Sequence, residues 1–151
     1  MSPIQVIAPI LIGLVLVTAV GFAPEPARQK FNAVFVAGAG AAHLSSGGVG
    51  PWELVFTAAM TFCAYRGLRS YRWIGVAWLL HTCWDIVHAI RGYPILPFAH
   101  GSSLGCAICD PVIALWCLAK GPSIPEALRA RRHTHHDPAP VSEFRPSAGS
   151  A

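Results

Sequence analysis

The chain has 151 residues, of which 54% are hydrophobic and only 12% are charged, and its mean hydropathy is +0.49. A soluble domain carries about 25% charged residues, so this composition argues against an ordinary soluble protein. The many aliphatic and aromatic residues argue equally against a disordered one. The net charge is +4, but the basic residues are scattered between apolar runs, which excludes nucleic acid as an expected partner. The expected surroundings are a lipid bilayer.

Five apolar segments follow one another along the chain, and each is a candidate helix for crossing a hydrocarbon core of about 30 Å. Their expected bounds are residues 4–22, 31–44, 51–68, 73–91 and 102–119, and the short second segment could start near Arg28. The first segment could instead be a signal peptide, although residues 1–5 hold none of the basic residues that begin one. In the second, the small residues AGAGAA at 37–42 predict a closely packed, central helix.

The chain turns polar after Gly121. Residues 122–151 are expected to begin with a short amphipathic stretch, PEALRARR, and to continue as a disordered basic tail that could touch anionic lipid. The predicted organisation is therefore a transmembrane helix bundle over residues 1–121 and a cytoplasmic tail over residues 122–151.

The basic residues predict the orientation of the bundle. With five crossings, ten of the eleven Lys and Arg residues fall on one side of the membrane, and only Arg91 falls on the other. Basic residues gather on the cytoplasmic side of membrane proteins. The N-terminus is therefore expected outside and the C-terminus in the cytoplasm, in a multi-pass protein of the cell (inner) membrane.

The segment at 73–91 carries His81, Asp85 and His88 within its apolar body. At about 100° per residue, offsets of four and seven return to nearly the same face of a helix. Ionisable groups at membrane depth are costly, so they usually face the protein interior and mark a functional site. This stripe is the strongest functional signal in the sequence.

Other segments are expected to supply ionisable groups at a similar depth. With a rise of about 1.5 Å per residue, all of these groups fall in or just above the outer half of the bilayer. The additional residues are His43, Glu53 and Asp110 on three further segments, and His100 in the loop before the last segment. We therefore expect one polar chamber near the extracytoplasmic surface.

Imidazoles and carboxylates in one dry pocket are ligands for divalent metals. We expect His43, His81, Asp85 and His88 to be metal ligands, and Glu53 and Asp110 to act as catalytic acid or base. Zinc is the favoured ion, and copper and iron stay open. A polar hydrogen-bond network, or a pocket for a substrate or proton, would use the same residues.

Several of these residues could have a different role. Glu53 could cap the third segment, whose positive helix end lies beside it. His100 could be a solvated loop histidine. Arg91 could extend to the membrane surface, or neutralise a carboxylate or an anionic substrate. Asp110 precedes a proline and could mark a kink.

The five cysteines are an odd number inside apolar segments, which argues against a secreted disulfide scaffold. Cys106 and Cys109 form a CxxC pair that could cycle between dithiol and disulfide, or bind a soft metal. Vitamin K epoxide reductase-like enzymes place such a pair near the outer leaflet. The likeness ends at that motif, because the second, relaying cysteine pair is missing here.

The blocks HTCWDIVHAIRGYPILPFAHG and CAICDP resemble a small family of bacterial multi-pass membrane proteins known only as a domain of unknown function. The resemblance covers about residues 4–121 and implies no catalytic residue. The pattern is also similar to membrane hydrolases that hold zinc with His and Asp from several helices. Those proteins have about seven crossings, and their serine motif is not evident here.

The sequence thus predicts an all-α polytopic membrane bundle of about five transmembrane helices. The favoured function is a metal-dependent, hydrolase-like enzyme acting on a lipid-soluble substrate. One alternative is a non-enzymatic binding, transport or assembly subunit with a buried polar network. Another is a thiol–disulfide redox protein using Cys106 and Cys109. The small-residue helix could also serve a homo-oligomer.

Overall fold

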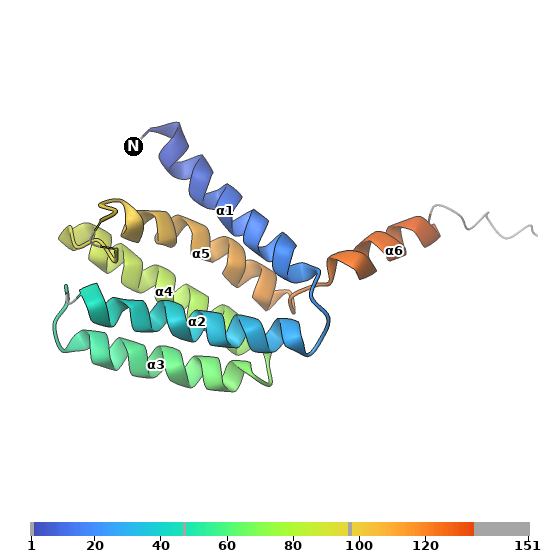
Figure 1. Cartoon of the computed structure of the whole chain (residues 1–151), viewed down its shortest axis with the longest axis horizontal. Coiled ribbons are helices and arrows are strands. Elements are labelled where there is room, and N and C mark those ends of the chain that lie inside the picture. The colour runs from blue at the N-terminus through green and yellow to red at the C-terminus, as the bar shows by residue number, and fades with distance from the viewer. Residues whose placement is uncertain (1, 47, 97, 135–151) are drawn as a thin grey trace, which may run out of the picture.

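A computed structural model describes residues 2–46, 48–96 and 98–134, and within them the chain forms six α-helices and no β-strand (Figure 1). The helices are α1 (Pro3–Gly21), α2 (Ala27–Ser46), α3 (Trp52–Gly67), α4 (Tyr71–Arg91), α5 (Ser102–Leu118) and α6 (Ile124–Thr134). Each of the five apolar segments becomes one helix, which confirms the all-α prediction. The amphipathic stretch after Gly121 lies within α6, and the predicted disordered tail falls mostly on residues 135–151, outside the described part.

Local chemistry explains several helix ends. The Ser2 backbone N–H donates to Gln5 Oε1 at 2.8 Å, so the first turn of α1 has a capping box. At the end of α4, Gly92 adopts a left-handed φ of 72°, which glycine does without a steric penalty. The second helix starts at residue 27 rather than 31, because Arg28 is buried within the fold. Its Nε donates to Glu25 Oε1 at 2.9 Å.

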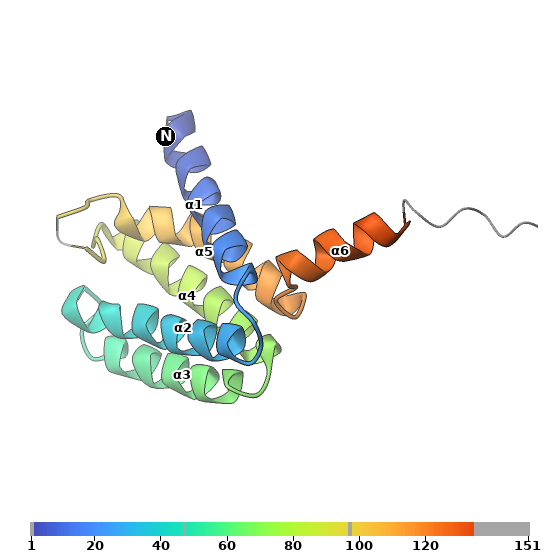
Figure 2. The ribbon, with the colours of Figure 1, turned by 45° about the vertical axis from the view of Figure 1, so that its right-hand side comes forward.

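The bundle is organised around α4, which packs against α2, α3 and α5. Helices α2 and α3 pair with each other, while α1 lies obliquely against α5 (Figure 1). Figure 2 shows α6 leaving the bundle beside the end of α1. The expectation that the small-residue helix is central was wrong. The side of α2 at Gly38 is exposed, and the central position belongs to the helix with the polar stripe.

The small residues of α2 allow close packing at one contact, between Gly40 and α3, rather than along the whole helix. A Cβ added at Gly40 would lie 2.6 Å from Met60 Cβ, so the missing side chain allows α2 and α3 to approach closely. Met60 is completely buried at this contact. The same approach brings the end of α2 beside the start of α3, where the polar site is built.

The surface of the bundle is strongly apolar. By length and composition, α1 and α4 are able to cross a membrane, and α5 is a shorter apolar helix. Large apolar side chains are exposed on all five bundle helices. Examples are Ile12 on α1, Val34 on α2, Val55 on α3, Ile90 on α4 and Leu115 on α5. The buried residues, by contrast, include nine polar or charged side chains among those described.

Candidate metal centre

Six ionisable side chains come together in the interior. They are His43 from α2, Glu53 from α3, His81, Asp85 and His88 from α4, and Asp110 from α5. Each is at most 4% exposed, and three of them are 0% exposed. The structure therefore gathers six of the seven residues that the sequence placed at one depth, and the seventh, His100, lies outside the cluster.

The helix order explains this convergence. Helix α4 turns His81, Asp85 and His88 inward at intervals of four and three residues. The turn between α2 and α3 puts His43 and Glu53 at neighbouring helix ends, and both ends reach the same end of the bundle as the C-terminus of α4 (Figure 1). Helix α5 packs along α4 in the opposite direction, which brings Asp110 beside His81.

One half of the cluster is centred on Asp85. His81 Nδ1 lies 2.6 Å from Asp110 Oδ2 and 3.0 Å from Asp85 Oδ2. The other oxygen of Asp85, Oδ1, lies 3.3 Å from His43 Nε2. Asp85 is completely buried, and each of its two oxygens faces an imidazole nitrogen. A buried carboxylate with an imidazole at each oxygen has the donor atoms of a metal site as well as those of a hydrogen-bond network.

The other half is centred on Glu53. His88 Nε2 lies 2.8 Å from Glu53 Oε1 and 3.4 Å from His43 Nδ1. The Trp84 indole N–H donates to Glu53 Oε2 at 2.9 Å, and the backbone N–H of Val49 donates to Glu53 Oε1 at 3.1 Å. Glu53 therefore contacts the backbone just before α3, as a helix cap would, and also takes part in the cluster.

These contacts define two groups with the donor atoms of a metal site. His43, His81 and Asp85 form the inner group, and His43, Glu53 and His88 form the outer group. Within each group, one ligand atom from every residue lies within 4.8 Å of the others. A tetrahedral ion with bonds of about 2.0–2.2 Å has its donors about 3.3–3.6 Å apart, so small side-chain adjustments would bring either group to that spacing. His81 and His88 thus belong to different groups rather than to one set of ligands.

A pocket of about 170 Å³ has one member of the outer group, His88, on its lining. His88 lies on its lining together with Tyr93, His100 and Ser103, and the pocket lies under the loop between α4 and α5. His100 is exposed, so the structure places it on the lining of this entrance and outside the two ligand groups.

A family comparison now adds to this geometry. Residues 4–123 match the family model described as a family of unknown function, DUF6010. The chain belongs to the DUF6010 family. The match begins and ends close to the range over which the sequence resembled a domain of unknown function. No curated protein matches the chain. No solved structure matches it either.

Three other predicted site residues of this DUF6010 chain are not members of the ligand groups. Arg91 is exposed at the end of α4. Cys106 and Cys109 are partly buried free thiols on α5. Neither cysteine belongs to a metal-ligand group among the described residues.

Two aromatic residues of the DUF6010 site were missed by the sequence reasoning. Trp84 holds the Glu53 carboxylate, and its ring stacks on Phe56 with centroids 4.9 Å apart. Phe56 in turn meets the His43 ring edge to face at 5.0 Å. Trp84 precedes His88 by four residues, so helical spacing was the available signal.

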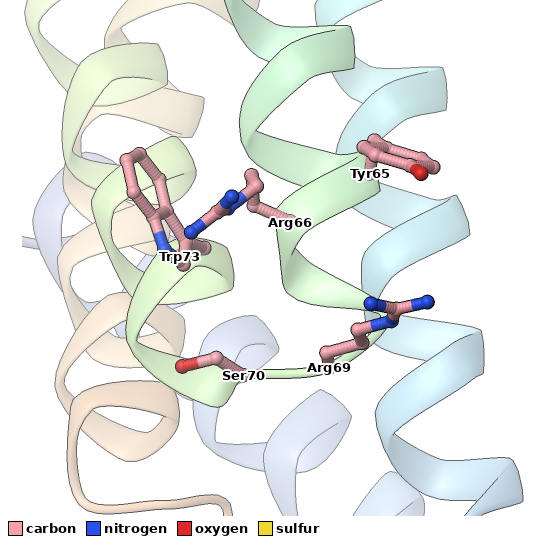
Figure 3. Close-up of a pocket in the computed structure, with 5 residues that line it drawn as sticks. All are labelled: Tyr65, Arg66, Arg69, Ser70 and Trp73. Carbon is pink, nitrogen blue, oxygen red and sulfur yellow. The ribbon is translucent and has the colours of Figure 1, made fainter.

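A second pocket, of about 250 Å³, lies at the turn between α3 and α4 (Figure 3). Its lining is Tyr65, Arg66, Arg69, Ser70 and Trp73. The Arg66 guanidinium lies 5.4 Å from the centre of the Trp73 ring, within the range of a cation–π contact. This pocket is at the opposite end of α4 from His88, so it is no entrance to the metal groups.

Proposed function

We propose that this DUF6010 protein is a multi-pass protein of the cell (inner) membrane, with α1 to α5 as its five transmembrane helices. The support is the reversed distribution of polarity, with apolar side chains on the outside of all five helices and charged side chains inside. The expected orientation puts the basic ends of α2, α3, α4 and α5 in the cytoplasm. The metal groups then lie in the outer half of the bilayer.

We further propose that the cluster holds a divalent metal ion and that the protein is a metal-dependent, hydrolase-like membrane enzyme. The observation that carries this proposal is Asp85, a completely buried carboxylate that shares a metal-ligand group with His43 and His81 and has an imidazole nitrogen within 3.3 Å of each of its oxygens. A divalent ion would stabilise the carboxylates, which are costly at this depth when they are uncompensated. Zinc fits the nitrogen and oxygen donors.

The entrance at His88 indicates where the chemistry would occur. An ion in the outer group would polarise an ester or amide carbonyl, and would make a bound water molecule a better nucleophile. Glu53, 2.8 Å from His88, would act as a general base through the carboxylate oxygen that does not bind the ion. A substrate could approach through the pocket under the α4–α5 loop. A lipid-soluble substrate suits a site that opens at membrane depth.

The test of the metal proposal is elemental analysis of the protein purified in detergent. Wild type is expected to retain zinc in stoichiometric amounts after dialysis, and a His81→Ala, His88→Ala double variant is expected to lose it. His100→Ala is the matched control, because it removes an imidazole at the entrance and no ligand. Zinc content that is equally low in wild type and the double variant would contradict the proposal. The enzyme proposal needs hydrolysis of a lipid ester or amide that the double variant lacks.

A second candidate function is proton transfer or transport. It is favoured by an unbroken series of contacts from Asp110 through His81, Asp85 and His43 to His88 and Glu53, each 3.4 Å or shorter. Chains of carboxylates and imidazoles form proton relays in membrane proteins. Liposomes that contain the protein and a pH-sensitive dye would then show proton flux under a potential. Asp85→Asn would abolish that flux.

The redox alternative stays a prediction. It requires that labelling of Cys106 and Cys109 by a thiol reagent increases after reduction. If labelling of these cysteines is the same before and after reduction, redox cycling is excluded.

A further inference from the structure

His43 lies between the two ligand groups and faces each with a different nitrogen. Its Nε2 is 3.3 Å from Asp85 Oδ1 in the inner group. Its Nδ1 is 3.4 Å from His88 Nε2 and 4.0 Å from Glu53 Oε2 in the outer group. The two nitrogens of an imidazole point away from each other, so one ring can bind an ion on each side once both nitrogens have lost their protons.

We propose that the centre holds two divalent ions with His43 as the bridging ligand, an inference that rests on the proposed metal-binding function. The inner ion is bound by His43 Nε2, His81 and Asp85. Asp110 supplies a fourth donor from its position 2.6 Å from His81 Nδ1. The outer ion is bound by His43 Nδ1, Glu53 and His88.

The two positions differ in the way that structural and catalytic zinc sites differ. Four protein donors close a structural site, whereas a catalytic site has three and keeps one position open. The inner position has four donors and lies away from the entrance. The outer position has three, and His88 lies on the lining of the 170 Å³ pocket. The inner ion therefore shapes the site, and the outer ion meets the substrate.

The charges of the cluster also favour two ions. Glu53, Asp85 and Asp110 carry three negative charges, and a His43 ring without either proton carries a fourth. Two divalent ions balance these four charges. A single ion would leave net negative charge in a buried site, where uncompensated charge is expensive. Each ion releases protons as it binds, because its ligands must be deprotonated.

The stoichiometry is tested by loading the full-length protein in detergent with Zn²⁺, removing unbound metal on a desalting column and measuring zinc per chain. Wild type and His100→Ala are expected to bind two ions. Asp85→Ala removes the carboxylate of the inner ligand group only, and Glu53→Gln replaces the carboxylate of the outer ligand group only. Each is expected to bind one. Circular dichroism and gel filtration of every variant verify that the helices and the monodisperse state are kept.

The bridge is tested with Cu²⁺ in place of Zn²⁺. An imidazolate couples the spins of two copper ions, so wild type is expected to lose most of its electron paramagnetic resonance signal per copper, and Glu53→Gln to give the full signal of one isolated ion. Two ions with a full, uncoupled signal would overturn the bridge. One ion in wild type would overturn the two-ion centre and leave the proposed single-metal function standing. No bound ion at all would overturn both.

Discussion

The contact between Glu53 and His88 gives the sharpest test of the cluster. Glu53 faces His88 Nε2 at 2.8 Å, the Trp84 indole at 2.9 Å and the Val49 backbone N–H at 3.1 Å. Glu53→Ala removes all three contacts and leaves buried donors without an acceptor. Each such donor costs about 1–3 kcal/mol when it loses its acceptor. With three donors affected, we expect Glu53→Ala to lower the free energy of unfolding by at least about 3 kcal/mol.

A double-mutant cycle isolates the part of this effect that belongs to the pair. Hydrogen bonds to charged groups contribute about 1.5–3 kcal/mol. Hydrogen bonds between the helices of a membrane protein contribute at most about 1.7 kcal/mol. The Glu53→Ala, His88→Ala double variant should therefore be about 1.5 kcal/mol more stable than the sum of its single variants predicts. Reversible unfolding in mixed detergent micelles, with a chelator present and followed by tryptophan fluorescence, measures this coupling.

The control is the same cycle with His100, which is exposed and outside the ligand groups. Glu53→Ala and His100→Ala should add within about 0.5 kcal/mol. If the Glu53–His88 coupling is equally small, the reasoning is refuted, and Glu53 acts only on the backbone at the start of α3.

Three further outcomes are expected. Zn²⁺ added to protein that a chelator has stripped of metal should raise the free energy of unfolding, by about 2.7 kcal/mol at one hundred times the dissociation constant. The measurement is the midpoint of thermal unfolding, and an unchanged midpoint would contradict a metal site in the folded state. Gly40→Leu should lower the free energy of unfolding by about 1–3 kcal/mol in micelle titrations, because its Cβ would lie 2.6 Å from Met60 Cβ; Gly38→Leu, where nothing lies within 4 Å, is the control. In intact cells, an impermeant thiol reagent should label a cysteine placed at His100 and spare one at Arg69; the opposite labelling would reverse the proposed topology.

The positions of the helices could be predicted from the sequence because length and hydropathy are local properties. All five apolar segments became helices, with ends within one or two residues of those expected except at α2. There, the apolar run begins at Phe31 and only a possible start near Arg28 was foreseen, whereas contacts with Glu25 and Tyr71 hold Arg28 in the fold. Those contacts come partly from a helix 43 residues later in the chain, and no local pattern encodes them.

The residues of the buried cluster could be predicted from the sequence, but their separation into two ligand groups could not. The spacing of His81, Asp85 and His88 fixes one face of α4, and depth alone indicated that His43 and Asp110 would join it. The sequence could not indicate that His43 would stand between two groups. That depends on the rotation of α2 about its axis and on its close approach to α3 at Gly40, both of which are set by packing across the bundle.

The buried cluster lies toward one end of the bundle and has its entrance there. In the proposed orientation, a cation that enters from the extracytoplasmic side crosses part of the voltage of an energised membrane before it reaches its ligands. One elementary charge moving through 100 mV gains about 2.3 kcal/mol. A divalent cation receives a share of twice that energy, in proportion to its depth, less the share of each proton that it displaces outward. The membrane potential would then favour binding of the ion, and cells without that potential would bind the ion less tightly.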